Sequence, residues 1–278
     1  MTCIPDDPMS TVLKADRSVA ESPAEIRITD LSMRYRTVSG DSVLALDRVS
    51  LAIEPREFVC VVGTSGCGKT TLLRIIAGLV RHTAGRVHLR DREISGPSAD
   101  VGIVFQGPVL LPWKTVLENV MIPVVVLGLD RDAHRRRAME LLDLVGLSGF
   151  EDKYPKELSG GMQQRASIAR ALVHQPSLLL MDEPFGALDA MTRETMNLEL
   201  QRIVKDAAIT VLFITHSIQE AVFLGDRIVV MTPRPGRIAE SMTIDLPRPR
   251  ELDAMSAPEF GSYVRAVRRL LNARGMTH

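Results

Sequence analysis

A short, continuously apolar segment, Phe58 to Val62, leads into a glycine-rich loop, Gly63 to Thr70, and then into a helical pattern ending near Leu79. A segment that is apolar at every position is typical of a strand buried on both faces of a parallel sheet. The loop has the spacing G-x-x-x-x-G-K-T, whose glycines let backbone N–H groups converge on phosphate oxygens. This succession of strand, loop and helix predicts an α/β fold with a phosphate-binding loop.

The individual positions of this loop have distinct expected roles. Lys69 can place its charge between the β- and γ-phosphates, and Thr70 can offer its hydroxyl to Mg²⁺. Cys67 is interpreted as a packing residue. The alternative, a glycine-rich turn with a surface lysine, leaves the flanking strand and helix unexplained. The residues predicted to bind nucleotide here are Gly63, Thr64, Ser65, Gly66, Cys67, Gly68, Lys69, Thr70 and Thr71.

Three more segments repeat the buried-strand pattern, and polar residues follow each of them. They are Val101 to Phe105, Leu178 to Met181 and Val211 to Ile214. Ligands of open α/β sheets bind at the carboxyl ends of the strands. Asp182 and Glu183 lie at such an end and point to different sides by strand alternation. Asp182 can therefore hold Mg²⁺, while Glu183 can accept a proton from an attacking water.

Gln106 and His216 follow the other two segments in the same way. A histidine after a strand is often a cap or a hydrogen-bonded core group. The expected position of His216, at the sheet edge that carries Asp182, favours a role at the site instead.

Weaker patterns outline the rest of the chain. Residues 1–24 carry three prolines and scattered charges and are expected to form a disordered tail. Residues 26–35 and 43–53 alternate apolar and polar side chains, which predicts half-exposed antiparallel strands. Two further strands are expected over 227–231 and 237–244.

Two helical regions complete the predicted organisation. Residues from about 115 to 165 form an inserted helical subdomain within a main domain that covers 25–250. Residues 251–278 are expected to form a C-terminal helix that packs on this domain through an apolar stripe. The sequence from Ser256 to Glu259 has the pattern of a capping box at the start of that helix.

Composition and charge exclude several classes of protein. Lys plus Arg and Asp plus Glu each number 34, and zero net charge argues against a nucleic-acid binder held by bulk electrostatics. The arginine-rich stretch 131–137 is interpreted as a solvated helix face. Three cysteines do not make a disulfide framework, and 120–129, the longest apolar stretch, is too short to span a membrane. With no secretory signal at the N-terminus, a cytoplasmic location is expected.

A second helix start suited to anions lies well downstream of the first. Leu158 to Arg165 contains Ser159, Gly160 and Gly161 at the start of a helix that runs to about His174. The free N–H groups and the dipole of such a helix start favour anions. One nucleotide needs a single phosphate cradle, so this second one requires a separate explanation.

The whole set of motifs resembles the ATP-binding subunit of ABC transporters over residues 26 to about 245. Gly63 to Thr70 resembles the Walker A loop, Leu178 to Glu183 the Walker B strand, and Leu158 to Gln163 the signature motif. By the same resemblance, four single residues have expected roles. They are Gln106 in the Q-loop, which also ligates Mg²⁺, Asp189 in the D-loop, the switch His216, and Tyr35, which stacks on adenine.

The resemblance accounts for the second cradle. In this family two subunits face each other head to tail, and each ATP lies between the Walker A loop of one and the signature helix of the other. Ser159, Gly160 and Gly161 would then face the γ-phosphate held by the Lys69 of a second copy. ATP closes the pair and hydrolysis releases it, so the implied cofactors are ATP and Mg²⁺.

Finer similarities indicate a group within the family. Gly107 to Trp113, Met162, and Met231 to Ile238 resemble the ATPases of nitrate, sulfonate and taurine importers. Leu110, Leu111 and Trp113 are expected to form a groove for a transmembrane permease, through which the chain cooperates indirectly with a solute-binding protein. The implied location is peripheral, on the cytoplasmic face of the inner membrane. The chain after His216 is expected to be too short for an extra regulatory domain.

Three positions depart from the family pattern, and three alternatives stay open. Met162 replaces a common glutamine, Gly186 a common serine, and Thr64 a proline frequent in related importers. The alternatives are an importer ATPase for another small solute, a non-transport ABC ATPase acting on ribosomes or DNA, and a regulatory module without turnover. Glu183 argues against the last of these, because a silent site has no need of a base.

Overall fold

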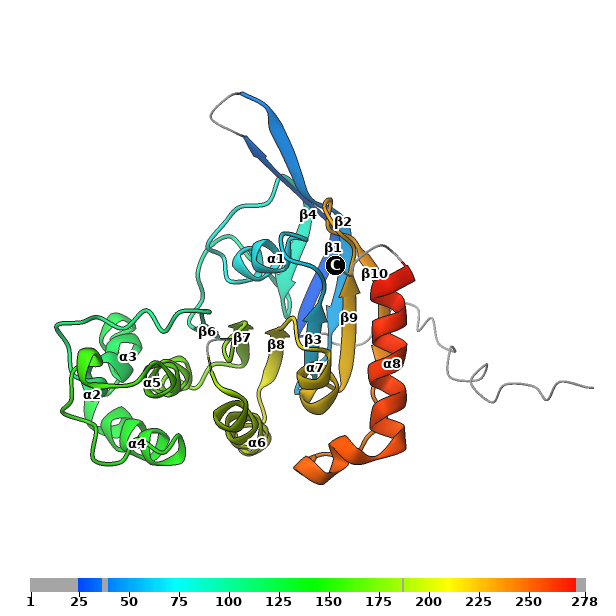
Figure 1. The fold of residues 1–278 in the computed structure, drawn as a ribbon. Coiled ribbons are helices and arrows are strands. Elements are labelled where there is room, and N and C mark those ends of the chain that lie inside the picture. The colour runs from blue at the N-terminus through cyan, green and yellow to red at the C-terminus, as the bar shows by residue number, and fades with distance from the viewer. Residues whose placement is uncertain (1–24, 37–39, 187, 274–278) are drawn as a thin grey trace, which may run out of the picture.

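A six-stranded sheet forms the centre of the computed structural model, which describes residues 25–36, 40–186 and 188–273 (Figure 1). Its strand order is β10-β9-β3-β8-β7-β6. All neighbouring pairs are parallel except β9 and β10. The strands are β3 (Phe58–Val62), β6 (Val101–Val104), β7 (Leu178–Asp182), β8 (Thr210–Ile214), β9 (Arg227–Met231) and β10 (Ile238–Thr243). The predicted tail, 1–24, lies outside the described residues.

A four-stranded antiparallel sheet with the order β2-β1-β4-β5 lies beside the central sheet. Its strands are β1 (Ile26–Arg36), β2 (Ser42–Ile53), β4 (Ala84–Leu89) and β5 (Arg92–Glu93). The alternating burial of β1 and β2 directs one face of this sheet into a core shared with α1 (Lys69–Ile76) and one face of the central sheet. Helix α1 ends earlier than expected, because the chain turns at Gly78, where a Cβ would lie 2.1 Å from the Gly96 carbonyl oxygen.

Four helices form a separate group beyond β6 and β7 (Figure 1). They are α2 (Val116–Val120), α3 (Ile122–Val126), α4 (Arg131–Leu144) and α5 (Gly160–Leu172), with a 3-10 turn over Pro155–Glu157 before α5. Apolar side chains on α2, α4 and α5 are buried in the same core as the other face of the central sheet. The predicted α/β fold, with a mainly parallel sheet, an antiparallel sheet and inserted helices, is confirmed.

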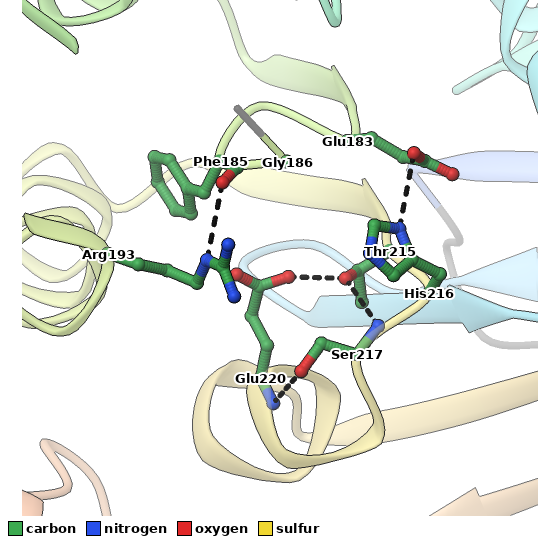
Figure 2. Close-up of a pocket in the computed structure, with 8 residues that line it drawn as sticks. All are labelled: Glu183, Phe185, Gly186, Arg193, Thr215, His216, Ser217 and Glu220. Carbon is green, nitrogen blue, oxygen red and sulfur yellow. Dashed lines mark hydrogen bonds and ion pairs between the residues drawn. The ribbon is translucent and has the colours of Figure 1, made fainter. Parts of the chain in front are cut away.

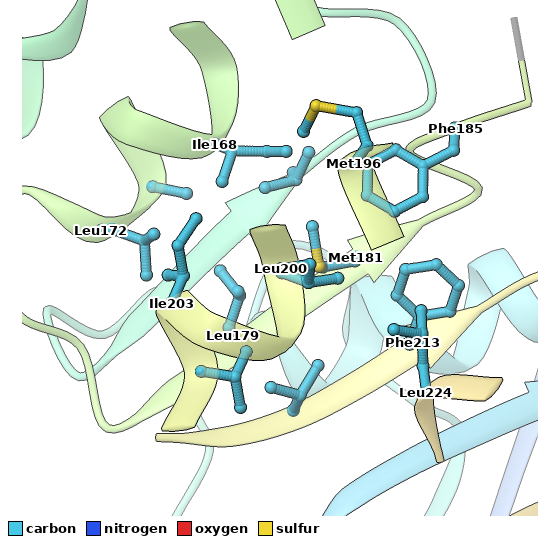
Figure 3. Packing of buried hydrophobic residues seen from close by; sticks show 14 of the residues in the cluster. Ile168, Leu172, Leu179, Met181, Phe185, Met196, Leu200, Ile203, Phe213 and Leu224 are labelled. Atoms are coloured by element: carbon cyan, nitrogen blue, oxygen red, sulfur yellow. The ribbon is translucent and has the colours of Figure 1, made fainter. Parts of the chain in front are cut away.

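The remaining helices follow β7 in the chain and pack against the central sheet. They are α6 (Ala190–Ala207), α7 (Ile218–Leu224), a 3-10 turn over Leu252–Ser256, and α8 (Pro258–Ala273). Figure 3 shows α6 side chains such as Leu200 packed among residues of β7, β8 and α5. Phe260 and Val267 bury the apolar side of α8 in this core. Within the described residues, no helix is both long enough and apolar enough to cross a bilayer.

The start of α8 differs from the predicted capping box. Ser256 belongs to the preceding 3-10 turn, and α8 begins at Pro258. Ser256, the residue expected to cap the helix, is the last residue of this 3-10 turn, and the Ala257 carbonyl accepts from the Gly261 N–H at 3.1 Å.

Candidate functional site

The predicted site residues meet at one edge of the central sheet because the strands that carry them are parallel neighbours. Gly63 follows β3, His216 follows β8, Asp182 ends β7, and Gln106 follows β6. Strands β3, β8, β7 and β6 are adjacent in that order, so their carboxyl ends lie side by side. This is the edge at which open α/β sheets bind ligands.

The glycine-rich loop wraps around the ammonium group of Lys69. Its Nζ donates to the carbonyl oxygens of Gly63 and Thr64 at 2.8 and 2.9 Å, and the side chain is 6% exposed. Gly68 has φ 105° and caps α1, and a Cβ there would lie 2.7 Å from Leu46. Glycine is therefore required where the loop turns into the helix.

The Cys67 thiol is fully buried beneath this loop. A Cβ on Gly63 would lie 2.9 Å from its sulfur, so the thiol fills the space under the loop. This placement fits the interpretation of Cys67 as a packing residue.

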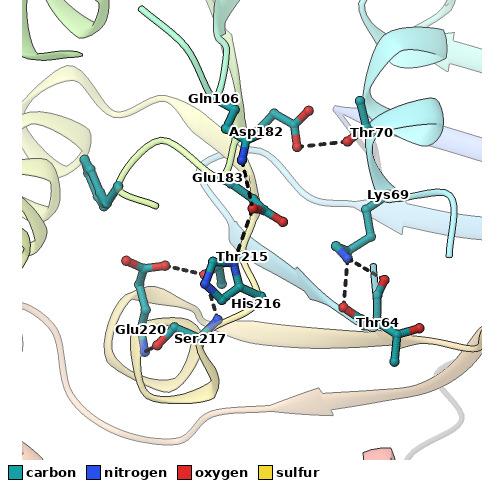
Figure 4. Close-up of polar contacts among 12 residues, drawn as sticks. Thr64, Lys69, Thr70, Gln106, Asp182, Glu183, Thr215, His216, Ser217 and Glu220 are labelled. Atoms are coloured by element: carbon teal, nitrogen blue, oxygen red, sulfur yellow. Dashed lines mark hydrogen bonds and ion pairs between the residues drawn. The ribbon is translucent and has the colours of Figure 1, made fainter. Parts of the chain in front are cut away.

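Thr70 and Asp182 form a pair of oxygen donors next to Lys69 (Figure 4). The Thr70 hydroxyl donates to Asp182 Oδ1 at 3.2 Å. Burial raises the pKa of Asp182, while the hydrogen bond from Thr70 lowers it and the nearby Glu183 raises it further. In the part of the chain that the structure describes, no group of three or more His, Cys, Asp or Glu is placed so that it could hold a metal ion. A hydroxyl and a carboxylate are oxygen ligands of the kind that can hold Mg²⁺ together with substrate phosphates.

Glu183 receives hydrogen bonds from two other predicted site residues. His216 Nδ1 lies 3.2 Å from Glu183 Oε2, and Gln106 Nε2 donates to the same oxygen at 3.5 Å. Glu183 itself has φ 46°, a conformation that is uncommon for residues other than glycine and that clusters at functional sites. Its backbone N–H is fixed by the Ile214 carbonyl of β8 at 2.9 Å. The position of Glu183, at the end of β7, is thus fixed by groups at the ends of β6 and β8.

Tyr35 lies beside the first turn of α1, although it belongs to the antiparallel sheet. Its hydroxyl is 3.4 Å from the Thr71 hydroxyl, and the side chain is 38% exposed. A partly exposed tyrosine therefore lies next to the phosphate-binding loop.

The second predicted cradle is also accessible. Ser159 and Gly160 are exposed, and the Ser159 hydroxyl accepts the Met162 N–H at 3.3 Å as the N-cap of α5. A Cβ on Gly161 would lie 3.1 Å from Leu188, so α5 begins close to the segment that precedes α6. Asp189 caps α6 by accepting from the Thr192 N–H and hydroxyl at 3.0 and 2.7 Å.

The segment from Pro108 to Trp113, which we call the apolar loop, exposes apolar side chains. Val109 and Trp113 are 62% and 69% exposed, whereas Leu110 and Leu111 are half-buried and Leu110 packs against the core. The predicted cluster of three apolar side chains is therefore only partly at the surface.

Sequence reasoning missed two residues that shape the apolar loop. Arg170 of α5 donates to the carbonyls of Val109 and Pro108 at 2.8 and 3.0 Å. The fully buried Asn119 accepts from the Leu111 N–H at 2.7 Å and donates to the carbonyls of residues 111, 114 and 115. Both are side-chain contacts to backbone, so the pattern of residue types gives no signal for them.

Taken together, these groups form the parts of a phosphoryl-transfer site. A loop of backbone N–H groups with a lysine can hold phosphates, and the Thr70–Asp182 pair can hold a divalent cation. A carboxylate oriented by a histidine and a glutamine can accept a proton from water. This combination suits hydrolysis of a nucleoside triphosphate.

Comparisons with known proteins agree with this chemistry. Residues 46–186 match the family model for the ABC transporter. The taurine import ATP-binding protein TauB of Rhizobium johnstonii is 46% identical over 89% of this chain and 97% of its own. The nitrate import ATP-binding protein NrtD of Synechocystis is 44% identical over 90% of this chain and 96% of its own.

A solved structure extends the agreement to the fold. The ATP-binding cassette MJ0796, in a dimer described as a post-hydrolysis state bound to ADP and Pi, superposes with a TM-score of 0.71. It is 32% identical and covers 80% of this chain and 99% of its own. With the family model matching half of the chain and relatives matching most of it, the chain belongs to the ABC transporter family as one of its ATP-binding, ATP-hydrolysing subunits.

Proposed function

We propose that this chain powers an importer for a small solute of the nitrate, taurine or sulfonate type, from the cytoplasmic face of the inner membrane. Relatives named for taurine and nitrate import match it over nearly its whole length, which supports this assignment. Its direct partners are a second copy of itself and a transmembrane permease, and a solute-binding protein acts through the permease. Nucleic acid has no part in this function.

One observation carries the assignment of the site: Gln106 and His216 converge on Glu183 beside the Lys69 loop and the Thr70–Asp182 pair. ATP binds with its phosphates on residues 63–71 and its adenine against Tyr35. Glu183 accepts the proton of the attacking water, and His216 and Gln106 orient it. Thr70, Asp182 and Gln106 hold Mg²⁺, which when bound neutralises charge on the phosphates.

The second cradle completes the site of another copy. Ser159, Gly160 and Gly161 present the start of α5 to the γ-phosphate held by the Lys69 of the partner, and Asp189 lies at the same interface. The exposure of Ser159 and Gly160 supports this arrangement, because both are accessible to a second chain. The solved cassette similar to this chain is likewise described as a dimer.

The importer assignment is tested by deleting the gene and measuring uptake of radiolabelled taurine, an alkanesulfonate and nitrate. Uptake of one of these solutes should fall to background and return with the wild-type gene but not with Glu183→Gln. Normal uptake of all three solutes in the deletion strain would contradict the proposed class of transported solute. ATP hydrolysis by the purified chain is measured separately, so that result would leave the ATPase assignment untouched.

Replacing Asp182 by asparagine should abolish the effect of Mg²⁺ on ATP binding without destabilising the free protein. Asparagine can still accept the Thr70 hydroxyl, but it lacks the charge that Mg²⁺ requires. Because burial raises the pKa of Asp182, its charged form is disfavoured in the folded chain, and a neutral residue removes that cost. ATP titrations in MgCl₂ and in EDTA, with thermal melts, measure both effects.

Asp132→Asn, on the exposed side of α4, is the matched control and should behave like the wild type. An Asp182→Asn protein whose ATP affinity still rises normally with Mg²⁺ would remove Asp182 from the metal site.

The apolar loop supplies a direct signal for permease docking. Trp113 is the single tryptophan of the chain and is largely exposed, so covering it with an apolar partner surface should shift its emission to shorter wavelength. A permease in which every tryptophan is replaced by phenylalanine lets this signal be read alone, and Trp113→Phe provides the blank. An unchanged spectrum on assembly would exclude this loop from the interface.

A further inference from the structure

Behind the Glu183–His216 pair lies a buried carboxylate, Glu220, for which the proposed mechanism has no use. It belongs to the first turn of α7 and is 6% exposed. Burying a carboxylate costs free energy unless hydrogen bonds and opposite charge compensate. The groups that compensate Glu220 come from two different segments of the site (Figure 2).

The first segment is the turn that carries His216. The Thr215 hydroxyl donates to Glu220 Oε2 and accepts the Ser217 N–H at 3.0 Å. The Ser217 hydroxyl in turn accepts the Glu220 N–H at 3.3 Å. These bonds join Thr215, Ser217 and Glu220, so the backbone is held on both sides of His216 while its imidazole reaches Glu183.

The second segment is the first turn of α6. Arg193 of α6 donates to the carbonyls of Phe185 and Leu188 at 3.3 and 2.8 Å. Phe185 lies two residues after Glu183, and Leu188 directly precedes Asp189. Figure 2 shows the guanidinium of Arg193 directed toward the Glu220 carboxylate. Burial raises the pKa of Glu220, and the hydrogen bond from Thr215 and the charge of Arg193 lower it.

We propose that Glu220 and Arg193 are positioning residues that hold the His216 turn and the backbone of Phe185 and Leu188 in one fixed relation. Neither residue contacts nucleotide. Glu220 fixes the position of the His216 backbone through Thr215, and Arg193 fixes the backbone at Phe185 and Leu188 through their carbonyls. A displacement of about 1 Å in a catalytic group is enough to cost roughly 100-fold in rate. This inference rests on the proposed roles of Glu183 and His216.

Glu220→Gln keeps an acceptor for Thr215 but removes the charge that faces Arg193. Its kcat for ATP should fall roughly 10- to 100-fold, while KM and nucleotide affinity stay within about twofold of wild type. Arg193→Lys, which lacks the planar fork, should give the same pattern. If the two residues act through each other, the double variant loses no more than the worse single variant. Glu194→Gln, on the exposed side of α6, is the matched control and should keep the wild-type kcat.

Epistasis with His216 separates positioning from a merely structural role. His216→Ala should itself lose most of the turnover. Adding Thr215→Val, which removes the hydroxyl that joins the His216 turn to Glu220, should cause no further loss, because the residue held through this hydroxyl is gone. A wild-type kcat in Glu220→Gln, or a loss from Thr215→Val that multiplies fully in the His216→Ala background, would overturn the proposal. Should Glu220→Gln fold poorly, Arg193→Lys serves for the comparison of kcat with the wild type.

The same set of variants distinguishes failure of this inference from failure of the proposed function. If Glu183→Gln and His216→Ala both turn over ATP normally, the proposed catalytic assignment is wrong. If those two variants are inactive but Glu220→Gln and Arg193→Lys are normal, only the positioning role is wrong.

Discussion

Glu183→Gln should hydrolyse ATP about 100- to 10,000-fold more slowly than the wild type while binding ATP with normal affinity. Glutamine is nearly isosteric with glutamate and can still accept hydrogen bonds from His216 and Gln106, so the site keeps its geometry. It cannot accept a proton from water. Nucleotide binding depends on the Lys69 loop, where no contact changes. Steady-state phosphate release and equilibrium titration with a fluorescent ATP analogue measure the two quantities separately.

The control for this result is Glu140→Gln, an identical chemical change on the exposed side of α4. It should leave both hydrolysis and binding unchanged. Turnover in Glu183→Gln within about twofold of the wild type would show that another group accepts the proton. A parallel loss of ATP affinity would instead show that Glu183 belongs to the binding surface.

Ser159→Asp should stop ATP hydrolysis in a pure sample, and mixing it with Lys69→Ala should restore about a quarter of the wild-type activity. Aspartate is as good an N-cap as serine, so α5 and the stability of the fold are preserved. Its charge would oppose the γ-phosphate that the partner copy holds. In equal mixtures about half of the dimers are mixed, and each of these has one site with both Lys69 and Ser159 intact.

Ser159→Asn is the matched control, since asparagine caps the helix without adding charge. It should retain far more turnover than Ser159→Asp, which isolates the effect of the charge. The wild-type specific activity should also fall on dilution as dimers dissociate. No recovery in the mixture, together with activity independent of protein concentration, would show that each copy hydrolyses ATP on its own.

Several parts of the fold and of the site were predictable because short runs of consecutive residues specify them. The run from Phe58 to Thr70 fixes strand, loop and helix start within one short stretch, and β3 and α1 form where expected. The polar residues after β6, β7 and β8 follow the same local rule. Parallel pairing then brings Gln106, Asp182 and His216 together, since carboxyl ends of parallel strands share one edge.

Other features depend on contacts that no local pattern encodes. Whether the apolar residues from 108 to 113 lie in the core or at the surface is decided by Arg170 and Asn119, which bind the backbone of that loop. Ser256 matched a capping box, but the chain around it forms a 3-10 turn and α8 starts beyond it. The cap that forms depends on the path of the chain between β10 and α8, which is set by packing.

The sequence by itself determined the type of fold, the phosphate-binding loop and the choice of Glu183 as the candidate base. These follow from short runs of residues and from the periodicity of burial. The tertiary structure alone decided that Gln106 and His216 meet at one oxygen of Glu183, and that Glu220 and Arg193 lie behind them. Side chains from separate strands and helices make these contacts, and only the packed arrangement of the sheet and helices specifies their distances and directions.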